Sequence, residues 1–384
     1  MGAEVIKVER PGAGDDTRAF APPFLPKNAA GEDSHISAYF AGANRNKSSI
    51  TLNYTMPEGQ AVIKRLLKTS DVLVENFKTG TLDKYNLGYS DLKNEFPRLV
   101  YCSITGFGQT GPYKSRPGYD ALIQAMGGIM SITGEPDGQP MKVGLSLCDL
   151  VSGMHGVMGI LAALRHASIS GEGQHVDISM LDVTTALLAN QGMNYLATGK
   201  VQPRLGNNHP NIVPYQVMPA SDGFFILSVA NDPTFERFVK VAQQADPSAG
   251  AENFLNDERF ATAVARVHNR ETMTEACNAI TKKRPVEWWL KELEANKIGC
   301  SPILNLEQVF QDPHVKARRM CMEMDIPSIE RPAKVISSPF KFDRTPVTYR
   351  SPPPELGQHT EEVLSEVAGY SAAEISELRE KKAI

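Results

Sequence analysis

The chain has 384 residues, of which 41% are hydrophobic and 22% charged, and its formal net charge is −4. This length predicts two domains rather than one, and the composition is typical of a globular protein. The small negative charge argues against attraction to nucleic acid or to a membrane surface, and we find no apolar run long enough to span a bilayer. Because no signal-peptide or transit-peptide pattern opens the sequence, we expect a soluble, cytoplasmic protein.

The cysteines and histidines are scattered along the chain. The five cysteines form no C-x-x-C pair, and the eight histidines include no H-E-x-x-H motif. Such spacing fits neither a disulfide framework nor a zinc site. We therefore expect no structural or catalytic metal.

The first half of the chain alternates between short apolar runs and helical periodicity, which indicates a parallel α/β sheet. The predicted elements are strands at 3–9, 71–75, 98–105 and 142–147 and helices at 57–68 and 152–166. Glycines recur at three-residue spacing in the second helix, at Gly153, Gly156 and Gly159. Since glycine lowers helix stability, we expect another backbone to pack closely against that face.

The second half predicts a smaller domain between two linkers. The predicted divisions are 1–198 for the first part of a large domain, 199–220 for a linker, 221–330 for the small domain, 331–354 for a second, proline-rich linker and 355–384 for a return to the large domain. The small domain is expected to contain a strand and three helical stretches, at 221–230, 233–242, 271–280 and around Trp288 and Trp289. A last helix at 361–380 is expected to dock on the large domain.

Residues 106–111 spell G-x-G-x-x-G after a predicted strand, which is the pattern of a dinucleotide-binding loop. That loop requires an apolar helix directly after it, but Pro112 and the polar run 113–117 stand there instead. The fingerprint also belongs after the first strand of its sheet, whereas at least two candidate strands precede this one. We therefore interpret the segment as a mobile glycine loop and not as a nicotinamide site.

Asp149 lies where the predicted strand at 142–147 passes into the predicted helix. From the residues alone a helix N-cap is the favoured interpretation, because aspartate is a preferred capping residue. The alternative is a nucleophile: a helix N-terminus keeps a carboxylate ionised, and nearby backbone N–H groups could hold an oxyanion. Cys148 is a rival nucleophile, but no nearby cation would favour its thiolate, so we expect a buried, inert thiol.

Cationic side chains gather in or beside the N-terminal loops, at Arg10, Arg18, Arg45 and Lys47. They fit a solvated surface, and they also fit a phosphate cradle, for which the guanidinium group is well shaped. Composition does not separate these two interpretations.

An ordered set of motifs carries a family resemblance along nearly the whole chain. The stretches are 2–12 (GAEVIKVERPG), 44–48 (NRNKS), 74–77 (VENF), 118–120 (GYD), 143–164, 206–207 (GN) with 214–215 (PY), and 353–359 (PPELGQH). Each is weak alone, but together and in this order they resemble the class III CoA-transferases, the family of formyl-CoA transferase and carnitine CoA-transferase.

The resemblance implies an α/β fold with a large Rossmann-like domain built from both chain ends, a small inserted α+β domain, and a homodimer whose two chains interlock. It implies that Asp149 is the catalytic nucleophile and that Asp120 is an acidic residue close to it. The positions that would bind CoA are Arg10, Leu52, Asn76, Phe77 and Lys84.

The implied mechanism is attack of Asp149 on an acyl-CoA thioester, which forms an aspartyl mixed anhydride. Exchange with CoA thiolate and with an acceptor carboxylate then completes the transfer. Because the acyl group stays activated throughout, neither ATP nor a metal is required, and coenzyme A is a substrate rather than a permanently bound cofactor. The implied partners are an acyl-CoA, a carboxylic acid and a second copy of the chain, without nucleic acid or membrane.

Three stretches are most similar to the members that move CoA from succinyl-CoA to glutarate or hydroxymethylglutarate: 9–18 (ERPGAGDDTR), 101–112 (YCSITGFGQTGP) and 212–216 (IVPYQ). A dicarboxylate keeps a remote charge in the pocket, and an unpaired buried charge is very costly. Arg204, with His209 beside it, is the expected partner of that charge; a linker arginine facing water is the alternative.

Departures from the family pattern keep other functions open. The family has one more strand and helix before the segment at Gly2, so we expect the chain to begin inside the pattern, and a non-catalytic CoA-binding protein stays an alternative. The glycine-rich lid of the formyl-CoA enzymes is absent, since 206–209 is GNNH, and formyl or oxalate specificity is not expected. An acyl-CoA racemase of the same fold is the second alternative, although Tyr119 stands where racemases have a histidine, and tyrosine is a poor substitute as a base.

Overall fold

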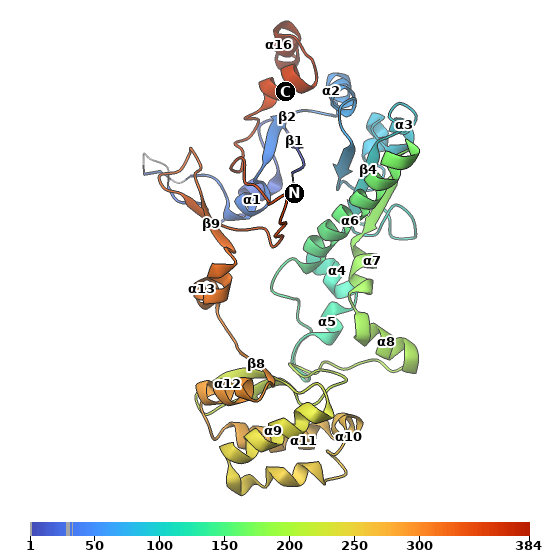
Figure 1. The fold of residues 1–384 in the computed structure, drawn as a ribbon. Helices are drawn as coiled ribbons and strands as arrows, with labels where there is room; N and C mark the ends of the chain where they lie inside the picture. The colour runs from blue at the N-terminus through green and yellow to red at the C-terminus, as the bar shows by residue number, and fades with distance from the viewer. Residues whose placement is uncertain (1, 28–30, 33) are drawn as a thin grey trace. The chain divides into compact units, whose positions relative to one another are not determined.

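The computed structural model describes residues 2–27, 31–32 and 34–384 (Figure 1). The fold is mixed α/β with parallel strand pairs, as predicted. The chain forms two compact units: unit 1 contains Met1–Thr105, His155–Ile178 and Leu306–Ile384, and unit 2 contains Gly106–Met154 and Ser179–Asn305. This division differs from the predicted boundaries, because it groups 106–154 and 179–198 with the small-domain segment and 306–330 with the chain ends.

The first sheet of unit 1 is the parallel pair β1 (Val5–Glu9) and β2 (Lys47–Thr51). A 3-10 turn, η1 (Asp16–Ala19), and helix α1 (Ala38–Ala43) lie between these strands in the sequence, and α2 (Pro57–Leu67) follows them. Proline is tolerated at the first position of α2, where its missing N–H would have had no partner. The predicted strand at 3–9 and helix at 57–68 are confirmed.

The second sheet of unit 1 has the order β3 (Val72–Glu75), β4 (Val100–Thr105) and β5 (His175–Ser179), and β3 is parallel to β4. The short elements η2 (Leu82–Tyr85) and α3 (Tyr89–Leu92) lie between β3 and β4. Two glycines of the long helix α6 (Leu147–Ser170) pack on this sheet: a Cβ at Gly156 would lie 3.1 Å from Ile104 Cδ1, and one at Gly159 would lie 2.7 Å from Val176 Cγ1. The expected close packing therefore exists, but against strand side chains rather than another backbone.

The C-terminal part of unit 1 returns to the first sheet. Its elements are α13 (Leu306–Gln311), α14 (Pro313–Ala317), the antiparallel pair β9 (Cys321–Met324) and β10 (Ala333–Ile336), α15 (Thr360–Glu362), the π-helical turn η5 (Val363–Val367) and α16 (Ala372–Glu380). The single helix expected at 361–380 is wrong, because the chain turns at Gly369 with φ +69° and restarts at a capping box formed by Ser371 and Glu374. Leu364 and Leu378 join Ile50 in one core, so both chain ends share it.

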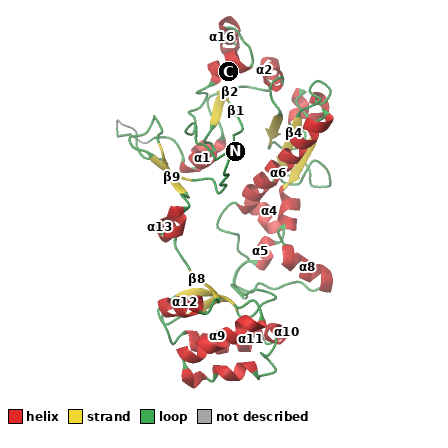
Figure 2. Cartoon of the chain, in the orientation of Figure 1, coloured by secondary structure: helices red, strands yellow, loops and turns green. Residues whose placement is uncertain are grey.

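Unit 2 combines helices with a sheet (Figure 2), whose strands are antiparallel. Its elements are α4 (Asp120–Met126), α5 (Ile129–Ile132), the start of α6, α7 (Met180–Ala186), α8 (Ala189–Thr198), β6 (Tyr215–Pro219), β7 (Phe224–Ser228), α9 (Asp232–Ala245), η3 (Pro247–Ala249), η4 (Ala251–Leu255), α10 (Ala263–His268), α11 (Arg270–Thr281), α12 (Val286–Ala295) and β8 (Gly299–Pro302). The strand and the helices predicted for 221–295 are confirmed. Phe225, Phe238 and Trp289 are fully buried in the core that joins this sheet to its helices.

Helix α6 carries an exposed apolar stripe. By length and composition alone it is able to cross a membrane, so the expectation that no apolar run is long enough to do so is wrong, although the core helix of a globular protein meets the same criterion. Only 22% of its most apolar window is buried within the described chain. Leu150, Met154, Met158 and Leu161 are each more than half exposed. Contiguous apolar surface of this kind usually marks an interaction site.

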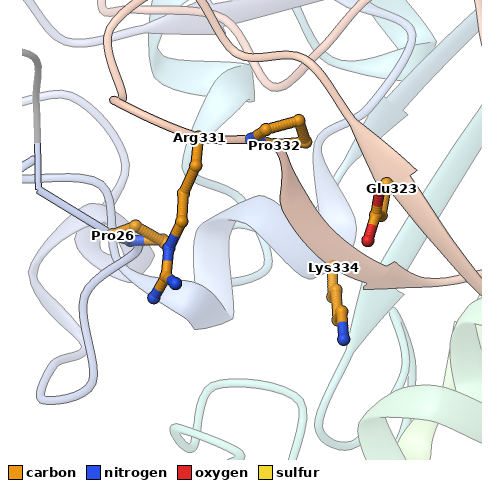
Figure 3. Close-up of a pocket in the computed structure, with 5 residues that line it drawn as sticks. All are labelled: Pro26, Glu323, Arg331, Pro332 and Lys334. Carbon is orange, nitrogen blue, oxygen red and sulfur yellow. The ribbon is translucent and has the colours of Figure 1, made fainter.

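A hollow of about 420 Å³ lies beside the β9–β10 pair of unit 1. It is lined by Pro26, Glu323, Arg331, Pro332 and Lys334 (Figure 3). The charged side chains around it are exposed, and none of the predicted site residues lines it.

Candidate active site

Asp149 is the third residue of α6, which begins at Leu147 rather than at residue 152. The strand expected at 142–147 is not formed: residues 142–146 are a loop, in which Leu145 is 50% exposed, and Leu147 already belongs to α6. Alternating apolar residues are stable as a strand only when a neighbouring strand pairs with them and a core buries one face, and no strand of the described chain pairs with this segment. The N-cap interpretation of Asp149 is also wrong, because the residue lies inside the first helical turn.

Asp120, the first residue of α4, caps the N-terminus of α6. Its Oδ1 accepts a hydrogen bond from the backbone N–H of Cys148 at 2.8 Å and lies 3.4 Å from the backbone nitrogen of Asp149. A carboxylate at this place satisfies N–H groups that have no partner within the helix, and the positive end of the helix dipole favours it. The structure thus brings Asp120 and Asp149 together, and the N–H groups that we expected to be available to an oxyanion are engaged by Asp120.

The electrostatics of Asp149 differ from the expectation. Partial desolvation raises the pKa of its carboxyl group above the ordinary value, and the negative charge of Asp120 raises that pKa further. The helix N-terminus alone would lower it, but Asp120 sits at that helix end and offsets the effect. Two carboxyl groups therefore share one helix end, with Asp149 the more exposed and Asp120 half-buried.

Cys148 is fully buried, as expected. Its Sγ accepts a hydrogen bond from the Thr184 hydroxyl at 3.1 Å, and the residue packs with Ile123 and Met180. Burial raises the pKa of the thiol; the Thr184 contact lowers it, and the charges of Asp120 and Asp149 raise it. A buried thiol next to two acids is a poor source of thiolate.

We expect Cys148→Ala to keep CoA transfer within about fivefold of the wild-type rate and to cost about 1 kcal/mol of stability. The reason is that the Thr184 hydroxyl retains its hydrogen bond to Met180 O, at 2.7 Å, so no buried donor is left unpaired. Initial rates and thermal unfolding of the purified variant measure both quantities. Complete inactivation in a normally folded Cys148→Ala protein would restore the thiol as a candidate nucleophile.

The cations of the N-terminal region separate into structural residues and one exposed residue. Arg18 forms an ion pair with the buried Glu9 at 2.8 Å, and Arg45 donates to Ile336 O at 2.6 Å. Burial lowers the pKa of Lys47, whose Nζ donates to Asn44 Oδ1. The Arg10 side chain, by contrast, is 62% exposed and pairs with the exposed Asp16. Among these four cations, Arg10 therefore fits a phosphate partner best.

An aromatic cluster lies beside the predicted CoA-binding positions of unit 1. Phe77, 39% exposed, packs on Tyr54 with ring centroids 5.4 Å apart, and Tyr54 also packs on Tyr85, next to Lys84. Burial raises the pKa of Tyr54, as does Tyr85, while the charge of Arg10 lowers it, so Arg10 lies near this cluster. Tyr54 was missed in the sequence, where a single tyrosine after a strand carries no signal.

The remaining CoA-binding positions differ in what they can contribute. Leu52 is 1% exposed and its side chain belongs to the core, so a ligand could meet only its backbone. Asn76 and Lys84 are exposed. These positions all belong to unit 1, whereas Asp120 and Asp149 belong to unit 2.

Glu75 holds the turn that carries Asn76 and Phe77. Its Oε2 accepts a hydrogen bond from the Phe77 N–H at 2.8 Å, and Ser103 also bonds to its carboxyl group. Ser103 Oγ in turn lies 2.9 Å from His175 Nε2, so the three side chains form a row across β3, β4 and β5. Burial is the largest effect on Glu75 and raises its pKa. The contacts among Glu75, Ser103 and His175 were not predicted from the sequence, because it does not show which strands lie next to one another.

Arg204 and His209 are engaged with nearby backbone. Arg204 donates to the carbonyl oxygens of Glu135, Pro136 and Gly138, at 3.1, 3.3 and 2.6 Å. The His209 ring stacks on Tyr215, and its Nδ1 accepts from the Asn211 N–H. Burial lowers the pKa of His209, and the charge of Arg270 lowers it further. No hydrogen bond joins Arg204 to His209 among the described contacts.

Comparison with known proteins shows the family of the chain. Residues 1–360 match the model of CoA-transferase family III. Similar proteins include a succinate–glutarate CoA-transferase of Agrobacterium fabrum, 46% identical over 96% of this chain and 89% of its own length, and the human succinyl-CoA:glutarate CoA-transferase, 36% identical over 98% and 83%. The crystal structure of a CAIB/BAIF family protein from Brucella suis superposes with a TM-score of 0.79 at 43% identity, covering 95% of this chain and 92% of that one. The chain is therefore a CoA-transferase and belongs to CoA-transferase family III.

Proposed function

We propose that this enzyme moves CoA from succinyl-CoA, or from another dicarboxylyl-CoA, to a carboxylic acid through a mixed anhydride on Asp149. The observation that carries the proposal is the contact of Asp120 with the first turn of α6, which places a second carboxylate beside the exposed Asp149. The names of the Agrobacterium and human relatives support succinyl and glutaryl groups as the acyl groups.

The steps balance with CoA and two carboxylates alone. A carboxylate oxygen of Asp149 attacks the thioester carbon, the C–S bond breaks, and CoA leaves as a thiolate. The thiolate then attacks the Asp149 carbonyl carbon of the anhydride, which releases succinate and leaves CoA as a thioester on Asp149. The acceptor carboxylate displaces that CoA, and the thiolate attacks the acceptor carbonyl, which gives the new acyl-CoA and regenerates Asp149.

CoA is proposed to bind at the loops of unit 1 that carry Arg10, Asn76, Phe77 and Lys84. The two cations would meet phosphate groups, for which charge-assisted hydrogen bonds are strong. Phe77 and Tyr54 would offer aromatic surface to the adenine ring.

A panel of CoA esters and carboxylic acids tests this function. We expect the purified protein to form glutaryl-CoA and succinate from succinyl-CoA and glutarate, as measured by liquid chromatography and mass spectrometry. Binding of CoA without turnover of any pair in the panel would favour the non-catalytic alternative. Epimerisation of a 2-methylacyl-CoA without transfer would favour the racemase alternative.

We expect Arg204→Met to raise KM for succinyl-CoA and glutarate about tenfold, with much less effect on monocarboxylic substrates, if the guanidinium meets the remote carboxylate as proposed. The alternative is that Arg204 has a structural role only, because its side chain donates hydrogen bonds to three carbonyl groups of the 135–138 turn. Steady-state kinetics on matched mono- and dicarboxylic pairs separates the two. Equal losses on both substrate types would remove Arg204 from the pocket.

The enzyme is further proposed to be an interlocked homodimer, with the large Rossmann-like domain built from both chain ends and each chain passing through the other. The exposed stripe of Leu150, Met154, Met158 and Leu161 on α6 supports a covering partner, and a second copy is the one that we propose.

Interlocked chains cannot separate without opening a domain, so we expect a dimer by light scattering at every concentration down to the low micromolar range. Met158→Lys, which places a charge in the stripe, should lower the yield of folded dimer, whereas Val264 of α10, which is also more than half exposed, should tolerate lysine. A folded wild-type monomer at low micromolar concentration would contradict the assembly.

A further inference from the structure

Gln124 lies one turn after Asp120 on α4 and is completely buried. Its Nε2 donates to Asp120 Oδ2 at 2.7 Å and lies 3.4 Å from Leu145 O, while its Oε1 accepts from the backbone N–H of Val143 at 2.8 Å. All of these residues belong to unit 2. Gln124 therefore connects the Asp120 carboxylate to the loop that leads into α6.

The partners of the Gln124 amide fix its orientation. If the amide were turned by 180°, its oxygen would face the Asp120 carboxylate and the Leu145 carbonyl, and its NH₂ group would face the Val143 N–H. All three contacts would then become repulsive, and a buried polar group without partners is costly. Gln124 thus has one acceptable orientation, in which it donates to Asp120.

The hydrogen bond that Gln124 donates stabilises the Asp120 carboxyl group. Asp120 accepts a hydrogen bond from the Gln124 amide on one carboxyl oxygen and from the N–H groups at the start of α6 on the other, so both oxygens act as acceptors. The titratable groups that face Asp120 across these contacts are Asp149 and Cys148. Neither carries a positive charge, so the N–H donors compensate the charge of Asp120.

We propose that Gln124 is a positioning residue for CoA transfer: it holds Asp120 fixed against the first turn of α6 and thereby sets the place of Asp149. The inference rests on the proposed role of Asp149 as the nucleophile. Because Gln124 is buried, it acts through Asp120 and not on the substrate. Its loss should therefore lower kcat and leave KM for succinyl-CoA nearly unchanged.

Gln124→Glu is the decisive variant because it keeps the shape and the acceptor for the Val143 N–H. When the introduced carboxyl group is protonated, its O–H can donate to Asp120 as the amide does. When that group is ionised, two carboxylates meet at hydrogen-bond distance, and they cannot both stay charged without disturbing the site. The ratio of mutant to wild-type kcat should therefore be highest at low pH and should fall by about tenfold or more as pH rises through the titration of the pair.

Gln124→Met removes the hydrogen bonds at every pH. We expect kcat to fall about 100-fold, the loss that a small misplacement of a reacting group produces, with no change of the ratio with pH. Gln216→Glu is the matched control, because Gln216 is a buried glutamine of unit 2, on β6, that bonds to Thr274 and not to Asp120. Rates are measured on folded protein well below the unfolding temperature.

A pH-dependent kcat ratio for Gln124→Glu that Gln216→Glu does not share supports the inference. The inference is overturned if Gln124→Glu shows a flat ratio, if both glutamate variants share one profile, or if the effect lies in KM. Should Gln124→Met fail to fold, the profile of Gln124→Glu decides alone. Asp149→Ala is measured in parallel: if it stays active, the proposed nucleophile fails, whereas loss of Asp149→Ala activity with a flat Gln124→Glu profile overturns only the role of Gln124.

Discussion

Asp149→Ala is expected to abolish CoA transfer, with a loss of at least about a thousandfold in kcat, while folding and CoA binding stay nearly intact. The loss is large because the mixed anhydride cannot form without this carboxylate. Folding should persist because Asp149 contributes its backbone N–H to the contact with Asp120, and alanine keeps that group. Initial rates, thermal unfolding and CoA titration measure the three quantities.

The matched control for Asp149 is Asp182→Ala. Asp182 is also an acidic residue in the first turn of a helix of unit 2, and it is exposed. Its replacement should leave transfer unchanged. Retention of a tenth or more of activity in Asp149→Ala, which corresponds to a loss of only about 1.4 kcal/mol in transition-state binding, would show that the role assigned to Asp149 is wrong.

Asp120→Asn is expected to lower kcat about 100-fold, because the asparagine cannot satisfy both of its partners. If its oxygen caps α6 as Asp120 Oδ1 does, its NH₂ group faces the Gln124 amide, which is also a donor. If it turns around, the start of α6 loses its acceptor. Steady-state kinetics with succinyl-CoA and glutarate measures the loss.

The pH profile of Asp120→Asn provides a second test, which predicts the direction in which the pKa of Asp149 moves. The negative charge of Asp120 raises the pKa of Asp149, so its removal should lower that pKa. Asp149 then becomes ionised at a lower pH, and the acidic limb of the kcat/KM profile should move to lower pH. Asp182→Asn should not move it. An upward shift, or an unchanged limb together with unchanged kcat, would contradict the pairing of the two carboxyl groups.

The elements that could be predicted from the sequence are those whose apolar residues recur on one face and are buried in a core. The strands at β1, β3, β4 and β7 and the helices at α2, α9, α11 and α12 were predicted from such patterns. The strand predicted at 142–147 is wrong because alternating apolar residues form a strand only beside a partner strand. This segment has none, and Leu145 lies half exposed in a loop. The last helix was predicted as continuous because a single glycine at 369 does not reveal its positive φ in the sequence.

The candidate site was predictable only where the family resemblance pointed to single residues. Asp149 and Asp120 were both named, but the capping role belongs to Asp120, which stands far from α6 in the sequence. Local propensity favours aspartate as a cap wherever a helix begins and cannot identify a cap supplied from another helix. Tyr54, Glu75 and Gln124 were missed because their contacts with Phe77, Ser103 and Val143 depend on how distant segments meet.

The central claim is that Asp149 carries the activated acyl group, and trapping with hydroxylamine tests it most directly. The protein is incubated with succinyl-CoA, treated with hydroxylamine, which converts an activated carboxyl group to a hydroxamate, and digested for peptide mass spectrometry. We expect a hydroxamate on Asp149 that requires succinyl-CoA and is absent from Asp182 and from the Asp149→Ala protein. Transfer that proceeds without any label on Asp149, or with the label on another residue, would contradict the claim.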